Sequence, residues 1–417
     1  MAKTVIVGGG IIGLFTAYYL MREGKEVCII DKSDLKSTCS TGNAGMIVPS
    51  HIIPLASPGA VGKGIKWLFS RKSPFYIHPK LDKKLLDWCL LFFRSSNVDH
   101  VERSIPYLKT LSILSKALYL DFDAEHKDSN IGLQQKGLLM LYLGHRAGIE
   151  EIEAAHLAQH HGLEAEILDS SELVSLEPNV KTAAMGGVYY PGDAHLKPAV
   201  LQQFLLQYLK ENGAEVLTKT TVTDFQIENG KIAKVITDKG EIIPNELIIC
   251  GGAWSGLIAE KLKLKLPMMG GKGYTFWQDN QPELKQATIL TEARVSVSPY
   301  GEKVRFGGTM EITGTDESVN LRRVQGIFES INRYYPSFES KASEVKDIWS
   351  GLRPCSPDGL PYIGQSSKYE NLFFGTGHSM MGISLAPATG KILTELIINK
   401  KAPIPLEGFS PERFSKR

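Results

Sequence analysis

The chain has 417 residues, which exceeds what one hydrophobic core usually supports, so we expect two domains. A hydrophobic content of 43%, a charged content of 22% and a formal net charge of +2 are ordinary for a globular protein and give no reason to expect a nucleic-acid partner. The five cysteines form no C-x-x-C pair and no apolar run reaches the roughly eighteen residues of a membrane span, so we expect a cytoplasmic protein without a disulfide framework or a metal site.

The first predicted elements surround a glycine-rich turn. Residues 5–7 are a β-branched run typical of a buried strand, and residues 8–13 follow with glycine at all three positions of a G-x-G-x-x-G pattern. Residues 14–22 have helical spacing, and residues 26–30 form a second strand that ends at Asp31. This order of strand, turn, helix and strand predicts a dinucleotide-binding unit.

Each part of this unit has a physical role. Gly8 permits the tight turn, Gly10 lets a pyrophosphate approach the backbone, and Gly13 lets the helix pack closely on the strand. The free N–H groups and the positive dipole end at the start of the helix bind phosphate. Asp31 would accept hydrogen bonds from an adenosine ribose. The motif alone leaves FAD and NAD open.

A polar segment of small residues, 37–46, follows Asp31. Such a segment offers backbone N–H groups and hydroxyls with little side-chain bulk, so it suits close contact with the rest of a cofactor. A surface loop is the alternative interpretation. The position directly after Asp31 favours the cofactor contact.

Residues 63–93 combine apolar, aromatic and basic side chains. The stretches 64–69 and 85–93 are dense in apolar and aromatic residues, with seven lysines and arginines among them. Buried helices are one interpretation. The other is peripheral contact with a membrane surface, near the site where a quinone takes electrons.

The middle of the chain alternates strands and helices. Strands are predicted at 137–143, 187–190, 215–217, 222–225, 232–236 and 246–250, and helices up to about 162 and at 198–209. The last of these strands opens into Gly251-Gly252-Ala253-Trp254, where a second phosphate or adenosine contact is expected.

From about residue 257 to 347 the pattern changes to alternating strands and one helix, at 319–334. The strands are predicted at 274–278, 294–299 and 304–308. A mostly antiparallel sheet of this kind is suited to holding a substrate against a cofactor. Glycine-rich segments then return, with a strand at 372–374 and a closing helix through residue 397.

Five motifs follow one another along the chain. They are the G-x-G-x-x-G turn with Asp31, the loop at 40–46, the strand before Gly251 to Trp254, the block from Trp349 to Gly364 and the Gly377-His378 loop. In this order they resemble the D-amino-acid oxidase superfamily of FAD-dependent oxidoreductases. Within it the chain is most similar to the bacterial D-amino-acid dehydrogenases, while its 385–390 run is more similar to the glycine oxidases. The resemblance covers nearly the whole chain and implies FAD rather than NAD.

The resemblance implies an α/β fold, with a Rossmann-like FAD-binding domain and a discontinuous substrate domain built on a mostly antiparallel sheet. It assigns residues 1–50, 182–256 and 349–417 to the FAD-binding domain, and residues 51–181 and 257–348 to the substrate domain. It also implies non-covalent FAD. Sarcosine oxidases tether FAD through a cysteine, and the cysteine of this chain's block, Cys355, stands at a different offset.

The same resemblance implies which residues contact the cofactor. The pyrophosphate and ribose contacts are Gly8, Gly10, Ile11, Ile12, Gly13 and Asp31, and Lys32, Cys39, Ser40, Asn43, Ala44, Gly45 and Met46 line the rest. The adenosine side is expected at Val222, Gly251 and Trp254, and the flavin ring at Gly377, His378, Ser379, Met380, Met381, Gly382, Ile383 and Ser384.

Arg353 is the candidate catalytic and substrate-binding residue. The family uses the arginine of its G-x-R-P block to bind the substrate carboxylate, for which a planar guanidinium offers a bidentate fit; a structural salt bridge is the alternative. The flavin takes a hydride from the substrate Cα, so His195 and His378 are expected to be packed rather than catalytic. Tyr274 and Met380 are further candidate pocket residues, although core packing suits Tyr274 equally well.

Two departures from the glycine oxidases bear on the substrate. Met380 stands where they carry an arginine and Ser296 where they carry a tyrosine, which favours an apolar or cyclic amino acid over glycine. Three functions stay open at this point. They are a D-amino-acid dehydrogenase, acting on D-proline or D-hydroxyproline among others and passing electrons to a quinone or another carrier; an oxygen-using oxidase of glycine, sarcosine or related amines; and an electron-relay flavoprotein subunit.

The closing helix has a predicted electrostatic role. Because it starts shortly after Gly382, its positive end is expected to point toward the flavin N1–C2=O and to stabilise the anionic reduced ring.

Overall fold

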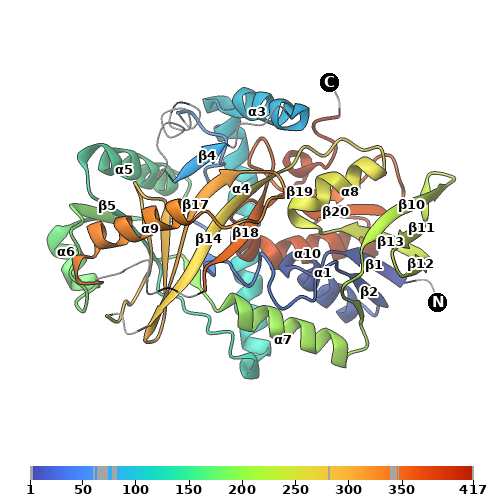
Figure 1. Ribbon diagram of the computed structural model, residues 1–417, viewed down its shortest axis with the longest axis horizontal. Helices are drawn as coiled ribbons and strands as arrows, with labels where there is room; N and C mark the ends of the chain where they lie inside the picture. Colours follow the sequence, from blue (N-terminus) through green and yellow to red (C-terminus); the bar gives the residue numbers. More distant parts are fainter. Residues whose placement is uncertain are drawn as a thin grey trace.

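The computed structural model describes residues 3–59, 62, 74–77, 82–279, 282–338, 345 and 347–415. The predicted apolar stretch 64–69 and five of the basic residues near it lie outside the described residues. Figure 1 shows two sheets side by side, the smaller one on the right of the view and the larger one on the left.

The smaller sheet contains the predicted dinucleotide-binding strands. Its strand order is β19–β20–β13–β1–β2–β9, and every neighbouring pair is parallel except β19 with β20. The strands are β1 (Lys3–Val7), β2 (Val27–Ile30), β9 (Glu215–Leu217), β13 (Pro244–Ile249), β19 (Tyr362–Gln365) and β20 (Leu372–Thr376). The central strands are continuous apolar runs because both faces of the sheet are covered.

One face of this sheet packs against four helices that share a single core. They are α1 (Ile11–Arg22), α4 (Val98–Glu125), α7 (Pro198–Glu211) and α10 (Gly382–Ile398). The other face is covered by α8 (Ser255–Lys261) and by a three-stranded antiparallel sheet of β10 (Val222–Glu228), β11 (Lys231–Thr237) and β12 (Gly240–Ile242).

The larger sheet has the order β18–β14–β17–β16–β15–β5–β7–β6, with β4 also paired to β17, counting only described residues. Its strands are β4 (Phe75–Ile77), β5 (Leu138–Tyr142), β6 (Glu166–Asp169), β7 (Gly186–Tyr190), β14 (Met269–Asp279), β15 (Ala287–Leu290), β16 (Val295–Tyr300), β17 (Lys303–Ile312) and β18 (Trp349–Cys355). Its helices are α3 (Lys83–Ser95), α5 (His145–His160), α6 (Ser170–Leu176) and α9 (Leu321–Tyr334). A separate short pair joins β3 (Met46–Ile47) to β8 (Ala194–His195).

The two faces of the larger sheet differ in what they contact. Alternate residues such as Phe276 and Phe306 pack under α9, where the ring centroids of Phe276 and Phe328 are 4.3 Å apart. The opposite face of β14, β16 and β17 meets residues 38–46. This contact positions the predicted cofactor loop between the two sheets.

The predicted domain boundaries do not separate the two sheets. β7, inside the predicted FAD segment 182–256, and β18, inside 349–417, both pair within the larger sheet. α4, inside the predicted substrate segment 51–181, packs in the core with α1 and α10 because its apolar residues complete that layer. The assignment of the segments to a cofactor and a substrate domain stays a prediction.

α3 is half buried rather than fully buried. Leu85 and Trp88 pack against the larger sheet, whereas Leu86, Leu90 and Phe93 are exposed. Among the described residues, none of the helices combines the length and the apolar character that a membrane span requires.

Candidate cofactor and substrate site

The glycine turn between β1 and α1 has the packing that the sequence predicts. Gly8 adopts a φ of +113°, and a Cβ there would stand 2.3 Å from the carbonyl oxygen of Cys250. A Cβ on Gly13 would stand 2.0 Å from the carbonyl oxygen of Gly8, so only glycine allows α1 to approach β1 this closely. At Gly10 a Cβ would meet only the Ser40 hydroxyl, at 3.4 Å.

The N-terminal turn of α1 keeps several N–H groups free. The Ile11 N–H donates to Ser40 Oγ at 2.9 Å, and the Gly9 N–H donates to Asp31 Oδ2 at 2.8 Å. Over the described ranges, no acceptor pairs with the N–H groups of Gly10 and Ile12. Free N–H groups at the positive end of a helix dipole form an anion-binding site.

Asp31 connects this turn to the strands beside it. Its Oδ1 accepts from the Ser33 N–H at 2.8 Å, and its carbonyl oxygen accepts from the Thr220 N–H at 2.9 Å. Val222 begins β10 two residues after Thr220, so the structure brings Asp31 and Val222 to the same end of the sheet. Their proposed contacts with an adenosine can therefore be made together.

The turn after β13 lies against the same region. The Cys250–Gly251 peptide packs on Gly8, and the ammonium of Lys32 lies 3.4 Å from the ring centroid of Trp254. Lys32, Gly251 and Trp254 thus surround the entry to the glycine turn.

The loop of residues 38–46 is fixed to the larger sheet by hydrogen bonds to its carbonyl groups. Thr275 Oγ1 donates to the Gly42 carbonyl at 3.2 Å, and Ser298 Oγ donates to the Ala44 carbonyl at 2.8 Å. Gly45 has a φ of +80°, and a Cβ there would stand 2.1 Å from the Leu196 carbonyl oxygen. The loop is therefore a defined wall rather than a free surface loop.

The segment from Gly377 to Ser384 forms the wall that continues into α10. Ser384 Oγ accepts from the Val48 N–H at 3.0 Å, and the Met380 carbonyl accepts from Asn43 Nδ2 at 3.5 Å. His378 is buried and bonded through Nε2 to Thr389 Oγ1, at 2.9 Å. Burial lowers the pKa of His378 to about 3, so its ring is neutral at physiological pH.

Arg353 projects from β18 over the face of the larger sheet that meets the 38–46 loop. Its Nη1 donates to the Thr309 carbonyl at 2.7 Å, and no carboxylate pairs with it in the described part of the chain. Thr309 holds a φ of +64°, which is strained for a β-branched residue. Burial lowers the pKa of the Arg353 guanidinium, as expected for a cation without a counter-charge.

Glycine clears the surface around Arg353. Gly273 and Gly351 form a directly opposed pair on β14 and β18. A Cβ on Gly273 would stand 2.0 Å from Arg353 Nη1, and one on Gly351 or Gly42 would stand about 2 Å from the indole of Trp349. Arg353 and Trp349 thus share a floor that no other side chain occupies.

Two of the predicted pocket residues have different positions. Tyr274 is fully buried beneath α9, with its hydroxyl hydrogen-bonded to Glu311 at 2.5 Å and to the Asn320 N–H at 3.1 Å. The structure supports core packing for Tyr274, and we leave it out of the site. Met380 is 48% exposed at the end of the flavin wall, next to Asn43.

Comparison with known proteins identifies the family. Residues 3–396 match the family model described as DAO, FAD dependent oxidoreductase. The chain belongs to this family.

Individual relatives of this FAD-dependent oxidoreductase agree with that result. The D-amino acid dehydrogenase of Helicobacter pylori is 30% identical over 400 residues, covering 94% of each chain. That of Granulibacter bethesdensis is 27% identical over 409 residues, covering 96% of this chain and 97% of the relative. Among solved structures, glycine oxidase from Geobacillus kaustophilus superposes with a TM-score of 0.79 at 23% identity, covering 99% of this chain and 98% of that one. L-proline dehydrogenase from P. horikoshii gives a TM-score of 0.74 at 19% identity, covering 100% and 98%. At these identities the two structures show the shared fold.

The residues of this family member fit FAD. The free N–H groups at the start of α1 suit its pyrophosphate. His378 Nδ1 and Ser379 Oγ are buried without a partner among the described residues, on the segment predicted to lie along the flavin ring. A bound cofactor would supply the missing partners.

Three residues of the site were not predicted from the sequence. Arg305 reaches the 38–46 loop, Trp349 covers Gly42 and Gly351, and Thr309 directs its carbonyl at Arg353. Only Thr309 had a signal in the sequence, the Gly307-Gly308 pair before it, because such glycines often mark a strand irregularity.

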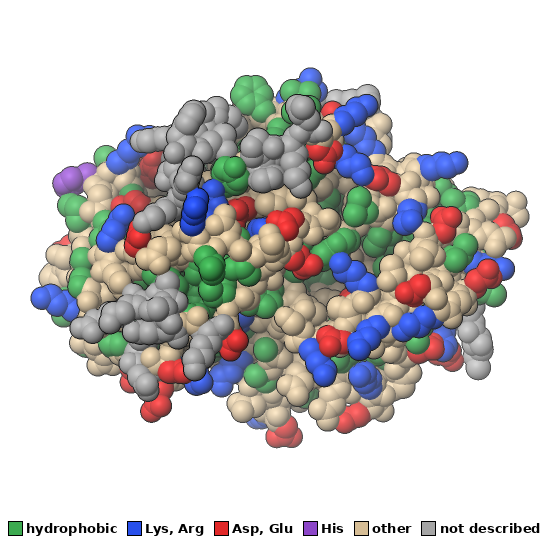
Figure 2. All heavy atoms as spheres, in the orientation of Figure 1, with side chains coloured by type: hydrophobic (Ala, Val, Ile, Leu, Met, Phe, Trp, Pro, Cys, Tyr) green, Lys and Arg blue, Asp and Glu red, His purple; other side chains and the backbone are tan. Residues whose placement is uncertain are grey.

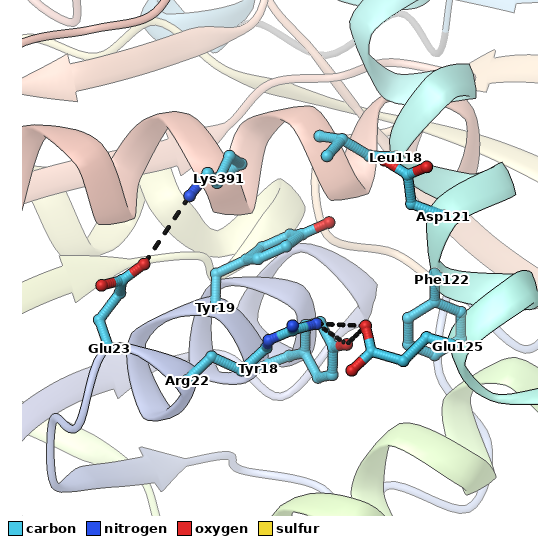
Figure 3. Close-up of a pocket in the computed structure, with 9 residues that line it drawn as sticks. All are labelled: Tyr18, Tyr19, Arg22, Glu23, Leu118, Asp121, Phe122, Glu125 and Lys391. Carbon is cyan, nitrogen blue, oxygen red and sulfur yellow. Dashed lines mark hydrogen bonds and ion pairs between the residues drawn. The ribbon is translucent and has the colours of Figure 1, made fainter.

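A separate cavity of about 250 Å³ lies on the outer side of α1, α4 and α10 (Figure 3). Its charged groups pair with one another: Arg22 with Glu125 at 2.5 Å, and Lys391 with Glu23 at 3.8 Å. Tyr19 lies eight residues along α1 from Ile11, which corresponds to about 12 Å of helix. The cavity is therefore remote from the phosphate-binding end of α1, and we assign no role to it.

Proposed function

We propose that the chain is an FAD-dependent D-amino-acid dehydrogenase that converts a D-amino acid to a 2-oxo acid and ammonia and passes two electrons to a quinone or another carrier. The observation that carries the proposal is the buried guanidinium of Arg353, without a carboxylate partner, on a glycine floor beside the predicted cofactor loop. When bound, FAD supplies the electron acceptor and takes the Cα hydrogen of the substrate as a hydride. Water hydrolyses the resulting imino acid.

In this proposal Arg353 binds the substrate carboxylate and fixes the orientation of Cα. The guanidinium keeps donors free beyond the one used on Thr309, so a carboxylate can bind through two parallel hydrogen bonds. Trp349, across the same floor, excludes water from one side. Positioning of this kind supplies much of the rate enhancement when the chemistry belongs to a cofactor.

The N-terminus of α10 supplies positive potential at the other wall. α10 begins at Gly382, has no acidic residue in its first turn and runs for 17 residues. Its aligned peptide dipoles favour negative charge near Gly382. We propose that this end faces the pyrimidine side of the flavin and stabilises the anionic reduced ring.

The choice of D-amino acids rests on the curated relatives, which are named D-amino acid dehydrogenases and align over nearly the full length. Met380 and Ser296, where glycine oxidases carry an arginine and a tyrosine, support an apolar or cyclic substrate such as D-proline or D-hydroxyproline. The glycine oxidase-like run at 385–390 supports the alternative function, an oxygen-using amine oxidase.

The assay that tests this function measures products without oxygen. The purified protein is supplied with an artificial electron acceptor and one amino acid at a time. The proposal expects equal amounts of 2-oxo acid and ammonia from D-amino acids and none from their L-enantiomers. Turnover of glycine or sarcosine with peroxide formation in air would instead select the oxidase.

We also propose that FAD is bound without a covalent link. Cys355 is fully buried, its thiol lies 3.4 Å from the Arg353 carbonyl, and burial raises its pKa to about 11. A buried neutral thiol is a poor nucleophile for attachment to a flavin. Release of all flavin into the supernatant on acid precipitation is the expected result.

The exposed stripe of α3 supports peripheral contact with a membrane as the route to a quinone. Leu86, Leu90 and Phe93 recur at i, i+4 and i+7 and are 49% to 64% exposed, while Trp88 on the buried side donates to the Cys355 carbonyl at 2.9 Å. Figure 2 shows hydrophobic side chains over α3 at the top of the view. The helix thus connects an apolar surface to the strand that carries Arg353.

Sedimentation with phospholipid vesicles tests this contact. A variant with Leu86→Ser, Leu90→Ser and Phe93→Ser should lose at least tenfold in vesicle binding. Replacing the equally exposed Val174 and Leu321 by serine provides the control and should change nothing. Equal sedimentation of all three proteins would contradict the membrane contact and leave the amino-acid chemistry unaffected.

A further inference from the structure

The largely buried arginines of the described chain fall into two classes. Arg323 and Arg413 each pair with a carboxylate, at 3.2 Å and 2.6 Å. Arg305 and Arg353 have no carboxylate partner in the described ranges, although Arg305 is only 6% exposed. An uncompensated buried charge is costly to a fold, so a chain that retains one commonly has a ligand to neutralise it.

The contacts of Arg305 tie it to the loop of residues 38–46. Its Nη1 donates to the Thr41 carbonyl at 2.8 Å, and its Nη2 donates to Thr275 Oγ1 at 3.2 Å. That Thr275 hydroxyl donates in turn to the Gly42 carbonyl. Nε is buried and has no partner among the described residues. Arg305 is therefore a full positive charge bonded only to neutral oxygens, two links from the backbone of the predicted cofactor loop.

Arg305 and Arg353 stand over the same face of β14 at different points. The Arg353 guanidinium lies over Gly273, and the Arg305 guanidinium lies at Thr275. These β14 residues are two positions apart, which corresponds to about 7 Å along a strand. The neighbour of Thr275 on β18 is Trp349, whose indole is placed against Gly42 and Gly351. The two charges thus have different immediate surroundings.

We propose that Arg305 is a positioning residue whose charge faces the bound FAD and raises its reduction potential, separately from the substrate contact of Arg353. The inference rests on the proposed course of FAD along residues 38–46. Reduction adds negative charge to the flavin, and a nearby cation held in a water-poor site favours the reduced form. The two hydrogen bonds to Thr41 and Thr275 hold the guanidinium at a fixed distance from the ring.

The test compares reduction potentials of the FAD-loaded protein, measured by equilibration with redox dyes. Arg305→Gln removes the charge and keeps hydrogen-bond donors, and Arg305→Lys keeps the charge. Arg294→Gln, at an exposed arginine in the turn before β16, is the matched control for the loss of a positive charge. Thr275→Val removes one partner of Arg305 without changing any charge.

The proposal expects the flavin reduction equilibrium of Arg305→Gln to shift at least tenfold toward the oxidised form, which for a two-electron couple is about 30 mV. Arg305→Lys, Thr275→Val and Arg294→Gln should each stay within threefold of the unchanged protein. An unchanged potential in Arg305→Gln, or an equal drop in Thr275→Val, would overturn the proposal. So would a rise in the KM for amino acids with no change in potential, because both arginines would then serve one carboxylate.

If Arg305→Gln does not retain FAD, the lysine variant decides. Retained FAD with an unchanged potential supports a role for the charge, whereas a lowered potential or lost FAD in Arg305→Lys contradicts it. Flavin bleaching by a D-amino acid is recorded separately for each variant, since it tests the proposed reaction and not the role of Arg305.

Discussion

The guanidinium of Arg353 lies so close to Gly273 that a Cβ on this glycine would stand 2.0 Å from Nη1. Gly273→Ala should therefore displace the guanidinium and raise the KM for the amino acid at least tenfold, while FAD content stays normal. Gly192→Ala is the control, because no atom lies within 4 Å of the added methyl group there. Equal kinetic constants in the two variants would show that Arg353 does not bind substrate in its observed position.

Removing Arg353 itself should have a larger effect. Hydrogen bonds to charged groups contribute about 1.5–3 kcal/mol each, so Arg353→Ala should raise KM by roughly ten- to a hundredfold. Arg353→Lys should recover only part of this, because an ammonium cannot make two parallel bonds. Steady-state kinetics at matched FAD occupancy provide the measurement, and an unchanged KM would refute the assignment.

Asp31 should control cofactor retention. Its carboxylate accepts from Gly9 N–H and from Ser33, so Asp31→Ala loosens the glycine turn and also removes the proposed ribose contact. We expect at least tenfold weaker FAD binding, measured by fluorescence as FAD is titrated into the apoprotein. Asp34→Ala, which removes an exposed carboxylate that accepts from Lys36 N–H, should leave FAD binding unchanged. Similar losses in both variants would contradict the assignment.

Asp193 should make stability depend on pH. It is fully buried, accepts from the Ser50 N–H and hydroxyl, and burial raises its pKa to about 7. Between about pH 4 and pH 7 the unfolded carboxyl loses its proton while the folded one keeps it, so this contribution to stability is lost as the pH rises toward 7. Asp193→Asn cannot ionise. Its melting temperature relative to the unchanged protein should rise from pH 5 to pH 7 and then level off; a constant difference would contradict the raised pKa.

The local elements were predictable because each one carries its own physical signal. The strand, glycine turn and helix at residues 5–22 are specified by β-branched residues, glycine and helical spacing, and the structure places β1 and α1 there. The helix at 198–209 and the strands at 222–225 and 232–236 were found for the same reason.

The pairing of distant segments was not predictable from one sequence. Nothing local shows that β18 pairs with β14, that α4 joins the core of α1 and α10, or that Tyr274 points under α9. Register decides which face a strand residue occupies, and a shift of one position reverses it. Arg305 was missed because an arginine in a strand gives no sign of what it will face.

Anaerobic bleaching of the bound flavin tests the central claim most directly. The yellow protein is mixed in turn with D- and L-amino acids, D-proline, cis-4-hydroxy-D-proline, glycine and sarcosine, and its visible absorption is followed. The account predicts rapid bleaching by D-amino acids, no bleaching by the L-enantiomers, and slow recovery of colour when air is readmitted. Bleaching by none of these compounds would contradict the proposed function and favour an electron-relay subunit, while rapid recovery in air with peroxide release would identify an oxidase.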